Sequence, residues 1–145
     1  MGGWEKLTFN TLQQRIHQHQ HLRELRNKLL HLHQVLLETE RITYEQVHGR
    51  VSRGELLQLA LAHEQFAWLH RISKLVVQID DRLRADEPVL PGDAQTLTAE
   101  ARMLITPVEV GNVFERKYHN ALQREPDAVL AHAEISKFLT PNRLG

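Results

Sequence analysis

Residues 49–54 read Gly49-Arg50-Val51-Ser52-Arg53-Gly54, and they hold the only two glycines between Leu12 and Leu83. The same interval contains no proline, and the runs on either side are dense in Leu, Gln, Glu, Arg and His. Gly49 is suited to end a helix, and Ser52 with Glu55 has the spacing of a capping box that begins the next one. The sequence therefore predicts a long helical hairpin, with helices over about residues 11–47 and 52–85.

Two apolar rows mark the first predicted helix. The row with heptad spacing consists of Leu22, Leu25, Leu29, Leu32 and Leu36. The row beside it consists of Leu30, Leu37, Tyr44 and Val47. Residues three and four apart share one face of a helix, so these rows predict a broad buried surface. Toward the N-terminus only Leu12 and Ile16 continue the pattern. A helix this long rarely stabilises itself, and we expect it to pack against other helices.

The second run carries apolar residues on one side at steps of three and four. They are Leu61, Ala62, Phe66, Leu69, Ile72, Val76, Ile79 and Leu83. Trp68, Leu75 and Val77 widen this side beyond a narrow seam. A stripe of this width indicates contact with more than one neighbouring helix.

The C-terminal part of the chain predicts three shorter helices. Two prolines and a glycine make residues 86–92 a loop, after which Asp93 is expected to cap a helix that ends near Ile105. A second capping box at Thr106-Pro107-Val108-Glu109 predicts the start of the next helix. The last helix begins at residues 125–127 and ends at Thr140-Pro141, because proline does not continue a helix.

These elements predict an all-α fold, a helical bundle built on a long antiparallel helical hairpin with three shorter C-terminal helices. At 145 residues the chain fits one domain over 1–145, with a flexible N-terminal arm at 1–9, the loop at 86–92 and a C-terminal tail at 140–145. Long hairpins with wide apolar faces often complete their cores by pairing with a second copy, so we expect a homodimer.

Composition narrows the class of protein. The 18 Lys and Arg balance the 18 Asp and Glu, which argues against nucleic acid as the partner. No apolar run approaches the roughly 18 residues needed to span a bilayer, so no membrane partner is expected. The N-terminus lacks the apolar core of a secretory signal, and the chain has no cysteine, which together favour a cytoplasmic location.

Histidine is the unusual feature of the composition, with ten in the chain. Apolar neighbours suggest partial burial of His33, His63 and His70, and a joint metal site would need a ligand such as His119 or His132 from another helix. The candidate ligands of a transition metal such as zinc or iron are therefore these five histidines. The alternative is that they are histidines at the edge of the core, hydrogen-bonded to backbone or carboxylate.

Other histidines lie near the N-terminus. His17 and His21 are four residues apart, but the same face continues with Glu24 and Lys28, which indicates a solvent-exposed surface. Six histidines in or just after the first predicted helix also allow a pH-sensing role, because their protonation near pH ~6 would add charge there. The six are His17, His19, His21, His31, His33 and His48.

No phosphate-binding glycine loop or nucleophile elbow is visible in the sequence. The sequence therefore favours a non-enzymatic protein of unknown biochemical role. We expect a protein–protein interaction or oligomerisation module that associates with itself through helix faces or with another protein. The alternative is a bundle that binds a metal or a small ligand through inward-facing histidines.

Overall fold

The computed structural model describes residues 3–106, 108 and 111–140, with side chains from residue 11 onward. Its elements are α1 (Gly3–His48), α2 (Arg53–Ala62), the 3-10 helix η1 (Glu64–Leu69), α3 (His70–Arg84), α4 (Pro91–Ile105), α5 (Val113–Arg124) and α6 (Pro126–Leu139). No strand occurs in the described part of the chain, so the predicted all-α fold is confirmed.

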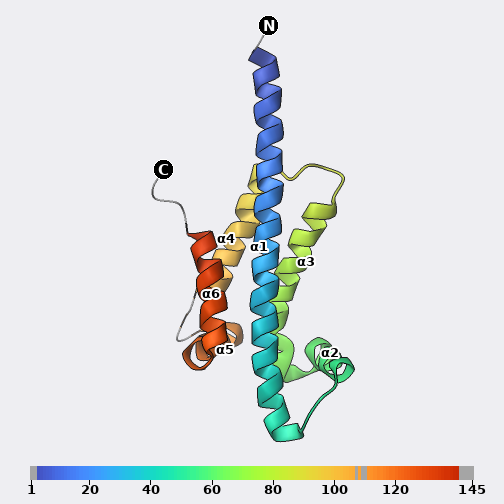
Figure 1. Cartoon of the computed structure of the whole chain (residues 1–145), viewed down its shortest axis with the longest axis vertical. Coiled ribbons are helices and arrows are strands. Elements are labelled where there is room, and N and C mark those ends of the chain that lie inside the picture. Colours follow the sequence, from blue (N-terminus) through green and yellow to red (C-terminus); the bar gives the residue numbers. More distant parts are fainter. Residues whose placement is uncertain (1–2, 107, 109–110, 141–145) are drawn as a thin grey trace.

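Helix α1 is the central element, and α3, α4 and α6 pack around it (Figure 1). At 46 residues and about 1.5 Å per residue it extends roughly 70 Å. The predicted start at Thr11 was too late, because α1 begins at Gly3 and includes most of the segment expected to be a flexible arm. Its N-terminal turns project beyond the ends of the other described helices (Figure 1). The apolar pattern accordingly ends in half-exposed Leu12 and Ile16.

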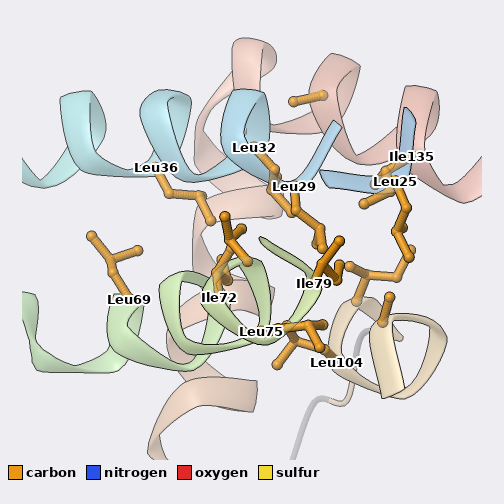
Figure 2. Packing of buried hydrophobic residues seen from close by; sticks show 14 of the residues in the cluster. Leu25, Leu29, Leu32, Leu36, Leu69, Ile72, Leu75, Ile79, Leu104 and Ile135 are labelled. Atoms are coloured by element: carbon orange, nitrogen blue, oxygen red, sulfur yellow. The ribbon is translucent and has the colours of Figure 1, made fainter. Parts of the chain in front are cut away.

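The heptad leucines of α1 form one wall of the core. All five, Leu22, Leu25, Leu29, Leu32 and Leu36, are fully buried, as predicted. Figure 2 shows four of them, with Ile72, Leu75 and Ile79 of α3, Leu104 of α4 and Ile135 of α6 in the same cluster. Burying one leucine side chain contributes about 1.5–3 kcal/mol, so this row alone accounts for much of the attraction between the helices.

The prediction of one continuous helix from Ser52 to Ala85 was wrong. The run is interrupted at His63, whose backbone is extended (φ −83°, ψ 137°), and it continues as η1 and then α3. The side chain of His63 accepts a hydrogen bond from the N–H of Gln65 and so caps η1. Of the apolar residues predicted to line one side of this helix, the first that is buried is Phe66, whereas Leu61 on α2 is exposed.

The turn between α1 and α2 agrees with the prediction, except that only one of the two hydrogen bonds of the expected capping box is present. Gly49 has a φ of +85°, a left-handed conformation that glycine adopts without a Cβ penalty, and its N–H donates to Glu45 O at 2.9 Å. Ser52 Oγ accepts a hydrogen bond from the N–H of Glu55 at 3.1 Å, which caps α2.

The later helix starts differ in part from the prediction. Helix α4 begins at Pro91, and Asp93 is not its cap but accepts a hydrogen bond from Arg82 of α3 at 2.8 Å. Helix α5 begins with a capping box formed by Asn112 and Glu115. In the box expected at 106–109, Pro107 and Glu109 lie outside the described residues; Thr106 instead donates its hydroxyl to Arg102 O at 2.7 Å and ends α4.

The last helix, α6, begins at Pro126 and ends before Thr140, as predicted, while 141–145 lie outside the described residues. It packs against α1, α4 and α5. Ala128, Ala131, Ile135 and Leu139 form its buried face, whereas Val129 is exposed. Small residues on this face let α6 approach its neighbours closely.

Candidate functional site

His33 lies in the middle of α1, and His70 is the first residue of α3. His33 is half-buried, and its pKa is lowered first by burial and then by the positive charge that His70 can carry. His70 is exposed, contrary to the partial burial expected for it, and its Nε2 lies 2.7 Å from the backbone oxygen of Ala60. That hydrogen bond joins the first residue of α3 to the end of α2, across the break at His63.

His63 occupies the break itself. Its Nδ1 accepts the Gln65 N–H at 3.1 Å, so this ring nitrogen is not free to bind another donor. The ring meets Tyr44 of α1 edge-on, with 5.4 Å between centroids, and Phe66 of η1 at 6.1 Å. The imidazole is therefore packed between aromatic rings and acts as the cap of η1.

His132 and His119 lie on the C-terminal helices. His132 Nδ1 is 2.6 Å from the hydroxyl of Tyr118, and burial lowers the pKa of the imidazole. His119 is half-buried on α5, and its side chain forms no hydrogen bond, ion pair or ring contact with the other described residues.

The histidines proposed as metal ligands thus lie in different parts of the bundle, and His119 shares no contact with the other four. Among residues 3–106, 108 and 111–140, no three or more His, Asp or Glu side chains are gathered in a way that could hold a metal ion. His63 contacts Tyr44 and His132 contacts Tyr118, whereas His33 is linked to His70 only through the effect of its charge on the His33 pKa. A zinc or iron site built from His33, His63, His70, His119 and His132 stays a hypothesis that rests on the sequence.

His21 has a larger structural role than the sequence indicated. The predicted solvent-exposed face of His21, Glu24 and Lys28 is wrong in part, because His21 stacks on Phe138 of α6 with 4.9 Å between centroids. Lys28 lies over the same ring at 5.5 Å. The phenylalanine is more than a hundred positions away in the chain, and no local pattern in the sequence could have pointed to it.

Helix α2 presents the most unusual surface. Leu56, Leu57, Leu59, Ala60, Leu61 and Ala62 make it apolar on nearly every side, yet it has no buried residue. Leu56 and Leu59 are half-buried against the core, whereas Leu57 and Leu61, four residues apart, are 61% and 68% exposed. A helix that is hydrophobic all round is normally buried, so this one is incompletely covered in the single chain.

The surface of the bundle has two hollows of note. One, of about 340 Å³, lies between the end of α1 and α2 and is lined by Tyr44, Leu59 and His63 among others. The second, of about 540 Å³, lies between α3, α4 and the start of α5. Its walls include Leu75, Leu104 and Phe114, with the guanidinium of Arg71 5.2 Å from the centre of the Phe114 ring.

The fold defines this protein as an all-α helical bundle. Comparison of the chain with protein-family models, with curated proteins and with solved structures found no match. None of the helices in the described part of the chain combines the length and the apolar character required to cross a bilayer.

Proposed function

We propose that this protein is a protein–protein interaction module that associates with a second copy of itself through α2. The observation that carries the proposal is the exposed leucine pair of α2. Leu57 and Leu61 occupy successive turns on the side of α2 away from Leu59, which faces the core. Burying both leucines against another chain would remove the exposed apolar surface that the monomer leaves in water.

The projecting N-terminal part of α1 offers a second contact. The N-terminal turns of α1 extend past the other described helices (Figure 1). Leu12 and Ile16, in the N-terminal third of α1, are four residues apart and both are about half exposed. Residues four apart form a continuous patch on one helix face. A partner helix laid along this section would bury both side chains.

A second copy is favoured as the partner by the charge of the chain. Its formal net charge is zero at pH 7, so two copies have no net repulsion to overcome. Helix α2 is about 15 Å long at 1.5 Å per residue, and it supplies only part of a standard interface of about 800 Å² per partner. We therefore expect a dimer of modest affinity, to which the α1 section contributes.

Sedimentation velocity over a hundredfold range of concentration tests this proposal. The unaltered protein should shift from monomer to dimer mass as its concentration rises. The double variant Leu57→Glu with Leu61→Glu should remain monomeric, because charged side chains would have to be buried at the contact. Leu130→Glu on α6 is the matched control, since Leu130 is equally exposed at 69%.

Two results would contradict the proposal. The first is a monomer mass at every concentration of the unaltered protein. The second is equal loss of the dimer in the Leu130→Glu control. Circular dichroism of each variant establishes that its helices are retained.

The proposal also includes a cytoplasmic location, with which the absence of cysteine agrees.

A further inference from the structure

Helix α6 is held in the bundle by polar and aromatic contacts to three other helices. Lys28 of α1 pairs with Glu134 at 3.4 Å, and Arg102 of α4 donates to the backbone oxygen of Leu139 at 2.8 Å. Lys28 also lies over the ring of Phe138 at 5.5 Å. Two further contacts each contain an imidazole, which titrates in mildly acidic solution: His21 of α1 on Phe138, and His132 of α6 on Tyr118 of α5.

The buried hydroxyl of Tyr118 has an acceptor in His132 only while the imidazole is neutral. Burial raises the pKa of the Tyr118 phenol, which is only 1% exposed, so the phenol stays protonated. When the neutral imidazole carries its proton on Nε2, the phenol O–H donates a hydrogen bond to Nδ1 of His132. If Nδ1 of His132 were protonated, its N–H and the O–H of Tyr118 would both be donors, and neither could accept from the other in the present arrangement. The hydrogen bond would then have to reverse, and the buried O–H of Tyr118 would lose its acceptor.

The surroundings of His132 give a positive charge little compensation. Tyr118 faces it from α5, and Arg102 of α4 lines the same small hollow of about 180 Å³ together with Ser136 of α6. No carboxylate is among the described residues that line this hollow. An imidazolium here would lose hydration without gaining an anion.

At the contact between His21 and α6, burial rather than a hydrogen bond disfavours the charged imidazole. Thr98 Oγ1 donates to Ala94 O at 2.6 Å, so it accepts from His21 Nε2, 3.2 Å away. Burial, followed by the charge of His17, lowers the pKa of His21, and Glu24 opposes this only in part. On α6, Phe138 faces His21 while Lys28 already lies over the same ring and pairs with Glu134. A protonated His21 would place a second cation on that ring.

We propose that α6 is an acid-sensitive latch, which protonation of His21 and His132 loosens from α1 and α5. Release would uncover the buried face of α6 and the part of α1 beneath it. Leu25 and Ile135, both fully buried in the common core cluster, would become accessible (Figure 2). The device is independent of the contact proposed for α2.

The direction of the pH effect follows from the pKa shifts. Both imidazoles have a lower pKa in the folded protein than the ordinary value of about 6.5, so the folded state binds fewer protons than the released one. Their contribution to the docking of α6 is fully present above about pH 6.5 and is lost as the pH falls toward the lowered values.

Hydrogen–deuterium exchange tests the latch by comparing protection factors at about pH 7.5 and about pH 5. We expect amides of α6 to lose protection at least tenfold at the lower pH, while those of α3 change much less. In the double variant His21→Gln with His132→Gln, this difference should disappear. His31→Gln with His119→Gln is the matched control, and it should retain the difference.

Three outcomes would overturn the latch: equal protection of α6 at both pH values, parallel loss of protection in α3, or a pH effect that survives in the His21/His132 double variant. If that variant does not fold, NMR titration of the unaltered protein decides. The rings of His21 and His132 must then titrate below the ordinary histidine pKa and in step with the opening of α6. Titration at or above that value would also overturn the latch.

Discussion

The indole Nε1–H of Trp68 donates a hydrogen bond to Oε1 of Glu40 at 3.0 Å. The other carboxylate oxygen of Glu40 accepts from Nε2 of Gln65 at 2.8 Å. One carboxylate of α1 thus accepts hydrogen bonds from two side chains of η1, and Trp68 is buried beside it. Because both donors lie just after the break at His63, Glu40 fixes how the interrupted run returns to the bundle.

Replacing Glu40 by Ala should destabilise the protein by about 1–3 kcal/mol, because the buried indole N–H loses its acceptor. Glu40→Gln should cost less, since the amide oxygen can still accept one hydrogen bond. Urea unfolding followed by circular dichroism measures both variants. Glu100→Ala, an exposed glutamate on α4 without a hydrogen bond to the described residues, is the control and should change stability by no more than about 0.5 kcal/mol. Equal stability of Glu40→Ala and the control would contradict the role given to Glu40.

The cap supplied by His63 should be replaceable by another acceptor. His63→Ala removes the acceptor of the Gln65 N–H and should cost about 1 kcal/mol, whereas His63→Asn should lose less, because asparagine is among the best capping residues. Thermal unfolding of the two variants makes the comparison. If Asn were no better than Ala, the packing of the ring against Tyr44 rather than the hydrogen bond would be the stabilising feature.

The parts of the fold that the sequence predicted depend on local rules. The heptad leucines of α1 repeat with the period of a helix, and the Gly49 and Ser52 signals act within a few residues. The interruption at His63 was missed because histidine is not a usual capping residue and because Glu40 lies 25 positions before Gln65. Tertiary contacts of that kind have no signature in a local pattern.

The histidines also differ in how far the local sequence predicted their surroundings. The sequence selected His33, His63 and His70 from their apolar neighbours, and the first two are half-buried whereas His70 is exposed. It assigned His21 to solvent because Glu24 and Lys28 share its face, whereas its partners Thr98 and Phe138 come from α4 and α6. Partners separated by 77 positions or more could be identified only from the folded chain.

The two glycines of the α1–α2 turn should respond to alanine with opposite signs. Gly49→Ala should destabilise the protein by about 1 kcal/mol, because a φ of +85° is unfavourable for a residue with a Cβ. Gly54→Ala should stabilise it by about 0.5 kcal/mol, since Gly54 is helical and an added Cβ would meet only Ser52 Oγ, at 4.0 Å. Parallel urea titrations compare the pair, and a loss of stability at Gly54 as large as that at Gly49 would refute the assignment of the turn.

Leucines of α1 should contribute less to the free energy of unfolding where the helix is exposed than where it is buried in the bundle. Leu29→Ala removes a fully buried side chain and should cost about 2–5 kcal/mol, the range for large-to-small changes in a core. The same change at Leu12, which is half exposed, should cost no more than about 0.5 kcal/mol in the monomer. Unfolding of both variants at low protein concentration makes the comparison, and equal losses would mean that Leu12 is covered in solution.

Removing the hydroxyl of Tyr118 should make His132 easier to protonate. Burial lowers the pKa of His132, and the O–H donated to Nδ1 favours the neutral ring as well, so Tyr118→Phe should move this pKa up toward the ordinary value of about 6.5. NMR titration of the ring protons measures the change. Tyr44→Phe is the control, because Tyr44 contacts His48 and His63 but not His132.

The stability of Tyr118→Phe should also depend on pH in a defined direction. Above about pH 6.5 the variant should be less stable than the unaltered protein by about 0.5–1.5 kcal/mol, the usual net contribution of one hydrogen bond. As the pH falls, protonation of His132 opposes the same hydrogen bond in the unaltered protein, so the difference between the two should narrow. A difference that stays constant from neutral to acidic pH would show that the bond does not depend on a neutral His132, and the acid-sensitive contact between α5 and α6 would have no basis.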